Sequence, residues 1–134
     1  MSHWTTLGTL SLLLLLGFIL LPTSAFAKDA VACRYLQSQG QNIQLEVSVQ
    51  SPPPASLIVI QRLPAGIAIT EASPPTKKYN EKSGEAKWLF KSVKPGTFVI
   101  GMTLDKPIGA GTIRGEIRYM DPVTGEMIRM PVIP

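Results

Sequence analysis

Strict alternation of apolar and polar residues is the sequence feature that most constrains the fold of this chain. Between residues 42 and 50 every second position is apolar, at Ile43, Leu45, Val47 and Val49. A period of two places these side chains on one face of a β-strand. The same alternation recurs at residues 67–71, 85–91, 98–104 and 113–119, with Leu89 as the exception in the second stretch. The sequence therefore predicts a protein built from short, half-buried strands.

Proline and glycine interrupt this pattern and mark the turns between the strands. Residues rich in these two types lie at 51–54, 63–66, 73–75, 94–96, 106–111 and 121–125. Residues 31–37, 56–62 and 127–132 complete the set of expected strands, whereas residues 76–84 are polar and are expected to form a loop. We see no helical period after residue 27. The pattern predicts an all-β fold, an antiparallel β-sandwich of about seven to eight strands.

The first 27 residues differ in character from the rest of the chain. Residues 7–21 form an almost unbroken apolar run, which is shorter than the roughly 20 residues that a membrane-spanning helix needs. Ala25-Phe26-Ala27 follows with the small-x-small pattern of a signal peptidase site. We predict a signal peptide at residues 1–27, cleaved before Lys28, and one β-sandwich domain at residues 28–134. The mature protein is then exported, to the periplasm or to the exterior or cell surface; an uncleaved anchor is the alternative.

The scarcity of histidine and cysteine argues against most kinds of catalysis. His3 is the one histidine and lies in the predicted signal peptide, so histidine-based triads and histidine-bearing metal sites are excluded from the mature domain. Cys33 is the one cysteine. It is a candidate for an intermolecular disulfide in an oxidising compartment; burial in the first strand and lipid attachment are the alternatives. We expect no enzyme activity, no cofactor and no bound metal.

A cluster of lysines offers a candidate binding surface. The net charge is +4 and every Lys and Arg follows residue 27. Six of the lysines gather in one part of the chain, at Lys77, Lys78, Lys82, Lys87, Lys91 and Lys94. If Lys87 and Lys91 share the outward face of their strand, the cluster could hold an anionic glycan or envelope polymer. Nucleic acid is disfavoured, because only Tyr79 is close enough to stack on a base. A merely solvated charged face is the alternative.

Two further side chains have structural roles that the sequence can predict. Trp88 and Phe90 share the i, i+2 spacing of one strand face with Ala86, which favours burial in the core over an exposed carbohydrate platform. Asp121 opens a turn that contains proline and glycine, and its carboxylate is expected to cap that turn rather than to bind calcium.

Three stretches resemble a known family of surface-protein domains. They are Leu63–Ser73, which begins Leu-Pro-Ala-Gly-Ile, the Trp-containing segment at residues 85–90, and residues 94–100, which begin Lys-Pro-Gly. In this order they are similar to motifs of the DUF11-like or conserved-repeat domains of bacterial and archaeal surface proteins. The resemblance covers about residues 42–104. It implies an immunoglobulin-like β-sandwich in an exported or cell-surface protein that acts as a spacer, adhesive module or assembly unit without catalysis.

Two function classes follow from these observations. The first is an exported, non-catalytic structural or interaction module that docks to protein partners of the envelope or exterior, or self-associates, through edge strands. For this class we expect residues 30–36 or 127–134 to lie at a sheet edge and to offer their backbone to another chain. The second class is a binding module for an anionic glycan or envelope polymer, which would use the lysine-rich face.

Overall fold

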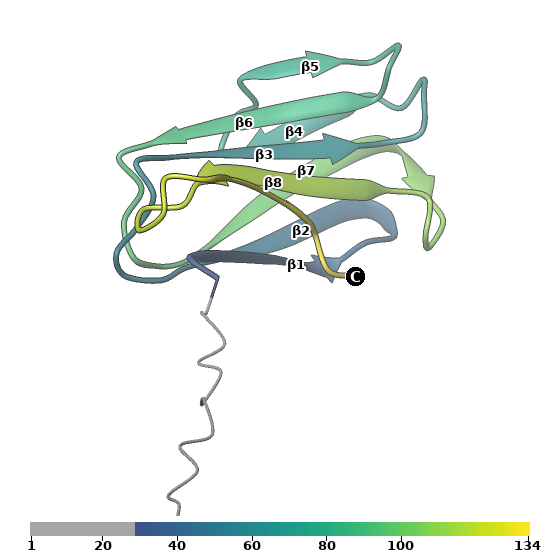
Figure 1. Ribbon diagram of the computed structural model, residues 1–134. Helices are drawn as coiled ribbons and strands as arrows, with labels where there is room; N and C mark the ends of the chain where they lie inside the picture. Colours follow the sequence, from purple (N-terminus) through teal and green to yellow (C-terminus); the bar gives the residue numbers. More distant parts are fainter. Residues whose placement is uncertain (1–28) are drawn as a thin grey trace, which may run out of the picture.

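A computed structural model describes residues 29–134 (Figure 1). The predicted signal peptide at residues 1–27 lies outside these described residues. Within them the chain forms nine β-strands and no helix that could cross a membrane. The strands are β1 Val31–Gln37, β2 Gly40–Val49, β3 Ser56–Arg62, β4 Ile69–Ser73, β5 Lys78–Asn80, β6 Glu85–Lys91, β7 Gly96–Ile108, β8 Arg114–Met120 and β9 Met127–Pro131.

The strands form two antiparallel sheets that stack as two layers (Figure 1). The four-stranded sheet has the order β1-β2-β7-β4, and the five-stranded sheet has the order β5-β6-β3-β8-β9. The spatial orders β1-β2-β7 and β9-β8-β3 are those of the A-B-E and G-F-C strands of immunoglobulin domains. The predicted all-β antiparallel sandwich is confirmed.

The strand count and several strand boundaries differ from the sequence prediction. The structure has nine strands rather than seven to eight, because β5 forms within the stretch that was expected to be a loop. With three residues, β5 is too short to show an alternation. β4 begins at Ile69 instead of residue 67, and β7 runs on to Ile108 through Pro107. A proline is tolerated there because the β2–β7 ladder shifts register between Gly40 and Asn42.

The core lies between the sheets and is built from the alternating apolar residues. Ile43, Leu45 and Val47 of β2 are completely buried, which the period of two requires. Trp88 is 1% exposed, and its indole Nε1 donates a hydrogen bond to the carbonyl oxygen of Pro74 at 2.8 Å. The prediction that Trp88 is a core residue is confirmed. Phe90 is partly buried and packs against the core.

Both terminal strands lie at sheet edges, β1 in one sheet and β9 in the other, as predicted. The chain itself, however, covers part of the β1 edge. The N–H of Ile133 donates to the carbonyl oxygen of Cys33 at 3.0 Å, and the N–H of Tyr35 donates to the carbonyl oxygen of Ile133 at 2.9 Å. The residues after β9 thus cross from the five-stranded sheet to β1 (Figure 1). We call residues 132–134 the C-terminal tail.

The three remaining edges each carry a feature that hinders the addition of another strand. β9 contains Arg129 and Pro131. β5 has three residues and includes Lys78. β4 has an irregular register between Ile69 and Glu71 and is followed directly by Pro74. The faces of the sheets are therefore better candidates for a binding surface than their edges.

Candidate functional site

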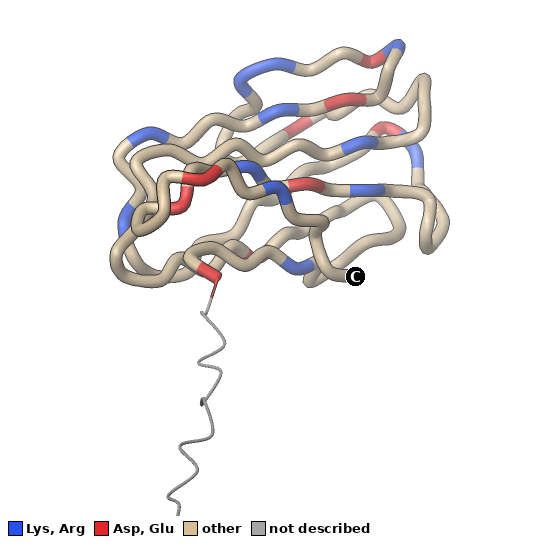
Figure 2. The backbone as a smooth tube through the Cα atoms, viewed as in Figure 1, with Lys and Arg blue, Asp and Glu red and all other residues tan. Residues whose placement is uncertain are grey.

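The outer face of the five-stranded sheet gathers basic residues from all five strands. In each strand the residues between the core positions point outward, so the register places residues from distant parts of the sequence side by side. We call this surface the basic face. Figure 2 shows its blue segments along the sheet. Its charged residues are Arg62, Lys78, Lys87, Lys91, Arg114, Arg118, Arg129, Glu85 and Glu116.

The basic face contains all of the excess positive charge of the protein. It holds seven of the 13 Lys and Arg residues of the sequence but two of the nine Asp and Glu residues. Its formal charge is therefore +5, whereas the whole chain has +4. The rest of the sequence carries a formal charge of −1. Electrostatic attraction of an anionic partner is therefore concentrated on the basic face.

Three cross-strand pairs on the basic face join like charges. Lys78 lies directly opposite Lys87, Arg62 opposite Arg114, and Arg118 opposite Arg129. Like charges directly opposite each other in an antiparallel pair destabilise the sheet. A surface that only had to be soluble would gain by exchanging one member of each pair for an acid. Local rules of this kind are commonly broken at functional sites.

The two acids of the basic face, Glu85 and Glu116, form ion pairs with two of its arginines. Glu116 accepts hydrogen bonds from Arg118 Nε at 3.2 Å and Arg118 Nη2 at 3.1 Å. Arg62 lies between Glu116 and Glu85, with its nitrogen atoms 3.6 Å from a carboxylate oxygen of each. The hydrogen bonds from Arg118, together with the positive charge of Arg118 and Arg62, lower the pKa of Glu116. The carboxylate is therefore charged throughout the neutral range.

The other five cations have no such partner. In residues 29–134 no carboxylate oxygen lies within 4.0 Å of a side-chain nitrogen of Lys78, Lys87, Lys91, Arg114 or Arg129. These side chains keep their charges available for a ligand. Their long aliphatic stems cover apolar surface beneath: Ile60 belongs to the basic face, between Lys87 and Glu116, and is only 1% exposed.

The structure brings half of the predicted lysine cluster to this face. Lys78, Lys87 and Lys91 lie on β5 and β6 and point outward. Lys77, Lys82 and Lys94 lie in the connections next to these strands and are not part of the sheet. The arginines of β3, β8 and β9 were not predicted. The alternation of residues 113–119 already puts Arg114 and Arg118 on one side, but the adjacency of β8 to β3 is a property of the topology.

Cys33 lies on β1 with its side chain in the core, 3% exposed. Burial raises the pKa of its thiol to about 12, and the thiolate is the form that attacks disulfides. The inert, buried alternative therefore describes Cys33 in this structure. An intermolecular bridge through this residue would need β1 to open.

The acidic residues form no metal centre in the part of the chain that the structure describes, where no three potential ligands cluster. Asp121 caps its turn as predicted: its Oδ1 accepts hydrogen bonds from the N–H of Thr124 at 2.9 Å and of Val123 at 2.8 Å. These two bonds lower the pKa of Asp121. The carboxylate is thereby committed to the β8–β9 connection.

The chain is similar to two solved structures but matches no protein-family model and no curated protein. The resemblance to DUF11-like domains therefore stays a prediction. Among solved structures, the chain is similar to the human F-spondin reeler domain. The TM-score is 0.42, and the sequence identity is 9% over 78% of this chain and 89% of the reeler domain chain. A Reelin-N domain of F-spondin gives a TM-score of 0.41 and 9% identity over 78% and 88% of the two chains. A similarity of this extent transfers neither a function nor a binding site.

Proposed function

We propose that this protein is an exported, non-catalytic interaction module that binds an anionic polymer of the cell envelope or exterior through the basic face. The observation that carries this proposal is the set of three like-charged cross-strand pairs. Each pair costs stability in the free protein, and each is relieved when a negative group lies between its two members. A polyanion supplies such groups at several points of the face at once.

The shape and composition of the basic face favour an acidic glycan over nucleic acid. The aromatic residues of the strands that form it, Tyr79, Trp88, Phe90 and Tyr119, lie on the opposite, core-facing side. The face therefore lacks the side chains on which single-stranded bases stack. A glycan chain needs no such stacking, since its acidic groups can pair with lysine and arginine along its length.

Docking of a protein partner through an edge strand is supported less well. The chain's own tail bonds to β1, and the other three edges carry prolines, charges or irregular pairing. These are features that proteins use against strand addition. Export itself rests on the predicted signal peptide at residues 1–27.

Binding to polygalacturonate, with uncharged dextran as the comparison, tests the proposal. We expect the mature protein to bind polygalacturonate and not dextran, with an affinity that falls as salt is raised, because exposed charges are screened. The triple variant Lys78→Gln, Lys87→Gln, Arg129→Gln should bind at least about tenfold more weakly. Its fold should be retained, because these substitutions relieve two like-charged pairs.

A matched control removes the same charge from elsewhere. Lys82, Lys94 and Lys106 lie outside the basic face, and their replacement by Gln should change the affinity by less than about twofold. Equal weakening by both triple variants would mean that net charge, rather than the basic face, determines binding. Absence of binding at low salt would contradict the proposed function itself.

A further inference from the structure

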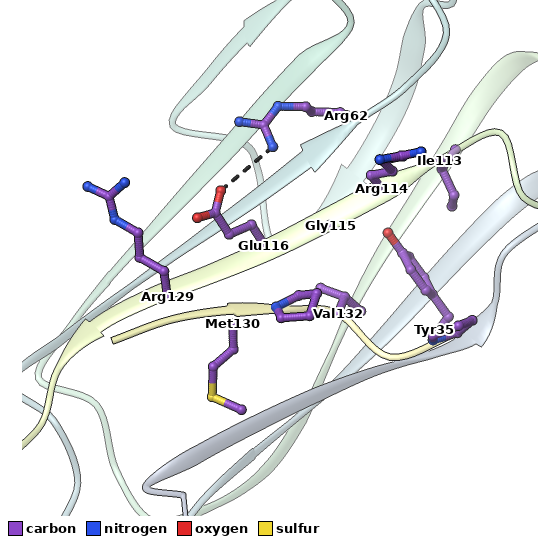
Figure 3. Close-up of a pocket in the computed structure, with 11 residues that line it drawn as sticks. Tyr35, Arg62, Ile113, Arg114, Gly115, Glu116, Arg129, Met130 and Val132 are labelled. Carbon is purple, nitrogen blue, oxygen red and sulfur yellow. Dashed lines mark ion pairs between the residues drawn. The ribbon is translucent and has the colours of Figure 1, made fainter. Parts of the chain in front are cut away.

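A cleft of about 490 Å³ opens at the end of the basic face, where β8, β9 and the C-terminal tail meet (Figure 3). Its apolar lining comes from Ile113, Met130, Pro131, Val132 and Pro134. This volume lies in the range of small-molecule sites, which combine apolar walls with a few placed polar groups. The cleft thus differs from the open face beside it.

The wall of the cleft is held in place by close packing around Gly115. A Cβ atom at this position would lie 2.5 Å from Cγ2 of Val132 and 2.7 Å from Oη of Tyr35, so only glycine allows the tail and β1 to approach β8 this closely. Tyr35 Oη donates a hydrogen bond of 2.6 Å to Oε1 of the fully buried Gln61. Nε2 of Gln61 in turn donates to the carbonyl oxygen of Arg114 at 3.1 Å. The backbone that carries Arg114 is therefore fixed from beneath.

Three arginines and one glutamate supply the charge of the cleft. Arg62 and Glu116 pair with each other, as the dashed line in Figure 3 marks. Arg114 and Arg129 lie on either side of that pair in the same view, and within residues 29–134 neither has a carboxylate oxygen within 4.0 Å. Two guanidinium groups without ion pairs thus border one apolar cleft. The planar fork of a guanidinium matches the two oxygens of a carboxylate.

We propose that this cleft is a subsite for one uronic acid residue of the anionic glycan, an inference that rests on the proposed function. The carboxylate of the sugar pairs with Arg114 or Arg129. The C–H face of the sugar ring lies against Pro131, which is directly opposite Glu116 and lines the cleft, and Glu116 accepts hydrogen bonds from ring hydroxyls. The basic face then provides general attraction for the polymer, while the cleft recognises the carboxylate-bearing sugar itself.

The test uses trigalacturonate, which is too short to span the face, and its carboxyl-reduced form, measured by calorimetry on the mature protein. We expect trigalacturonate to bind and the reduced trisaccharide to bind at least about tenfold more weakly. Arg114→Gln and Arg129→Gln should each weaken trigalacturonate binding by about tenfold. Lys87→Gln and Lys91→Gln remove the same charge from the face outside the cleft and should change it by less than about twofold.

The outcomes separate the two proposals. Equal weakening by the arginine and lysine variants would overturn the cleft inference, while polygalacturonate binding through the basic face would stand. Tighter, Arg114-dependent binding of a sulfated trisaccharide would overturn the uronic acid assignment. If wild-type protein bound neither trigalacturonate nor polygalacturonate, both proposals would fail.

Discussion

The outer faces of the two sheets differ in how charged residues pair across neighbouring strands. On the four-stranded sheet Arg34 lies directly opposite Glu46, and its Nε is 2.9 Å from the carboxylate. Uncharged polar residues pair there too, as in Asn42 with Thr103, joined by a side-chain hydrogen bond of 3.2 Å. On the five-stranded sheet three corresponding pairs join lysine to lysine or arginine to arginine, and only Arg62 also lies opposite an acid, Glu85.

This difference shows that the like-charged pairs are not a general property of the chain. The same sequence places opposite charges across from each other on one face and keeps three like-charged pairs on the other. Since the two sheets share one core, both faces are under the same stability requirement. The departure on the basic face supports the proposal that a partner with negative groups binds there.

The substitution with the largest expected effect tests whether the two sheets unfold as one cooperative unit. The comparison of their faces assumes that they do. Trp88→Ala removes a large, fully buried side chain and should lower the free energy of unfolding by about 3–5 kcal/mol. Denaturant unfolding followed by circular dichroism measures this. Leu89→Ala is the control: Leu89 is the next residue, points outward and is 37% exposed, so it should cost much less. Separate transitions for two halves of the sandwich would break the comparison.

A smaller effect is expected on the thermal midpoint of unfolding when a charge is reversed on each face. The shift should have opposite signs on the two faces. Arg34→Glu puts an acid opposite Glu46 and should lower the thermal midpoint by about 2 °C. Arg129→Glu puts an acid opposite Arg118 and should raise it by about 2 °C while weakening polygalacturonate binding. Differential scanning calorimetry at low salt gives both shifts. If the midpoint moved in the same direction in both variants, the three like-charged pairs would not be the source of the difference.

The smallest expected effect is a change in the stability of the protein at acidic pH. The folded-state pKa of Glu116 is lowered from its ordinary value of 4.5, so its ion pairs stabilise the folded state fully above that value. This contribution is lost as the pH falls through the lowered pKa. We expect wild-type protein to lose its stability advantage over Glu116→Gln below about pH 4.5. Urea unfolding of both proteins at pH 7 and pH 3 measures the difference, and an advantage as large at pH 3 as at pH 7 would contradict the prediction.

The sequence predicted the fold well because alternation and turn residues are local signals. The alternate residues of β2 lie buried as their period requires, at Ile43, Leu45, Val47 and Val49, and Asp121 caps the turn expected of it. β5 escaped prediction because three residues show no period. Its pairing with β6 depends on neighbours supplied by the rest of the sheet.

Only the lysines of the basic face were predicted from the sequence, because the positions of its arginines depend on the order of the strands in the sheet. Lys78, Lys87 and Lys91 are close in sequence and were recognised as a cluster. Arg62 and Arg129 reach the same face because β3 and β9 flank β8, an arrangement of strands that lie far apart along the chain. Sequence proximity also included Lys82 and Lys94, which lie in connections.

The contact between the C-terminal tail and β1 also determines the order in which the fold can be completed. The hydrogen bonds of Ile133 to Cys33 and Tyr35 join opposite ends of the described chain, so they cannot form until residue 133 has been synthesised. Synthesis proceeds from the N-terminus at about 5–20 residues per second, so β1 and β2 are available well before residue 133. During that interval β1 can already pair with β2, while its other edge is open to strands of other chains. The protection of this edge is thus among the last features that the growing protein acquires.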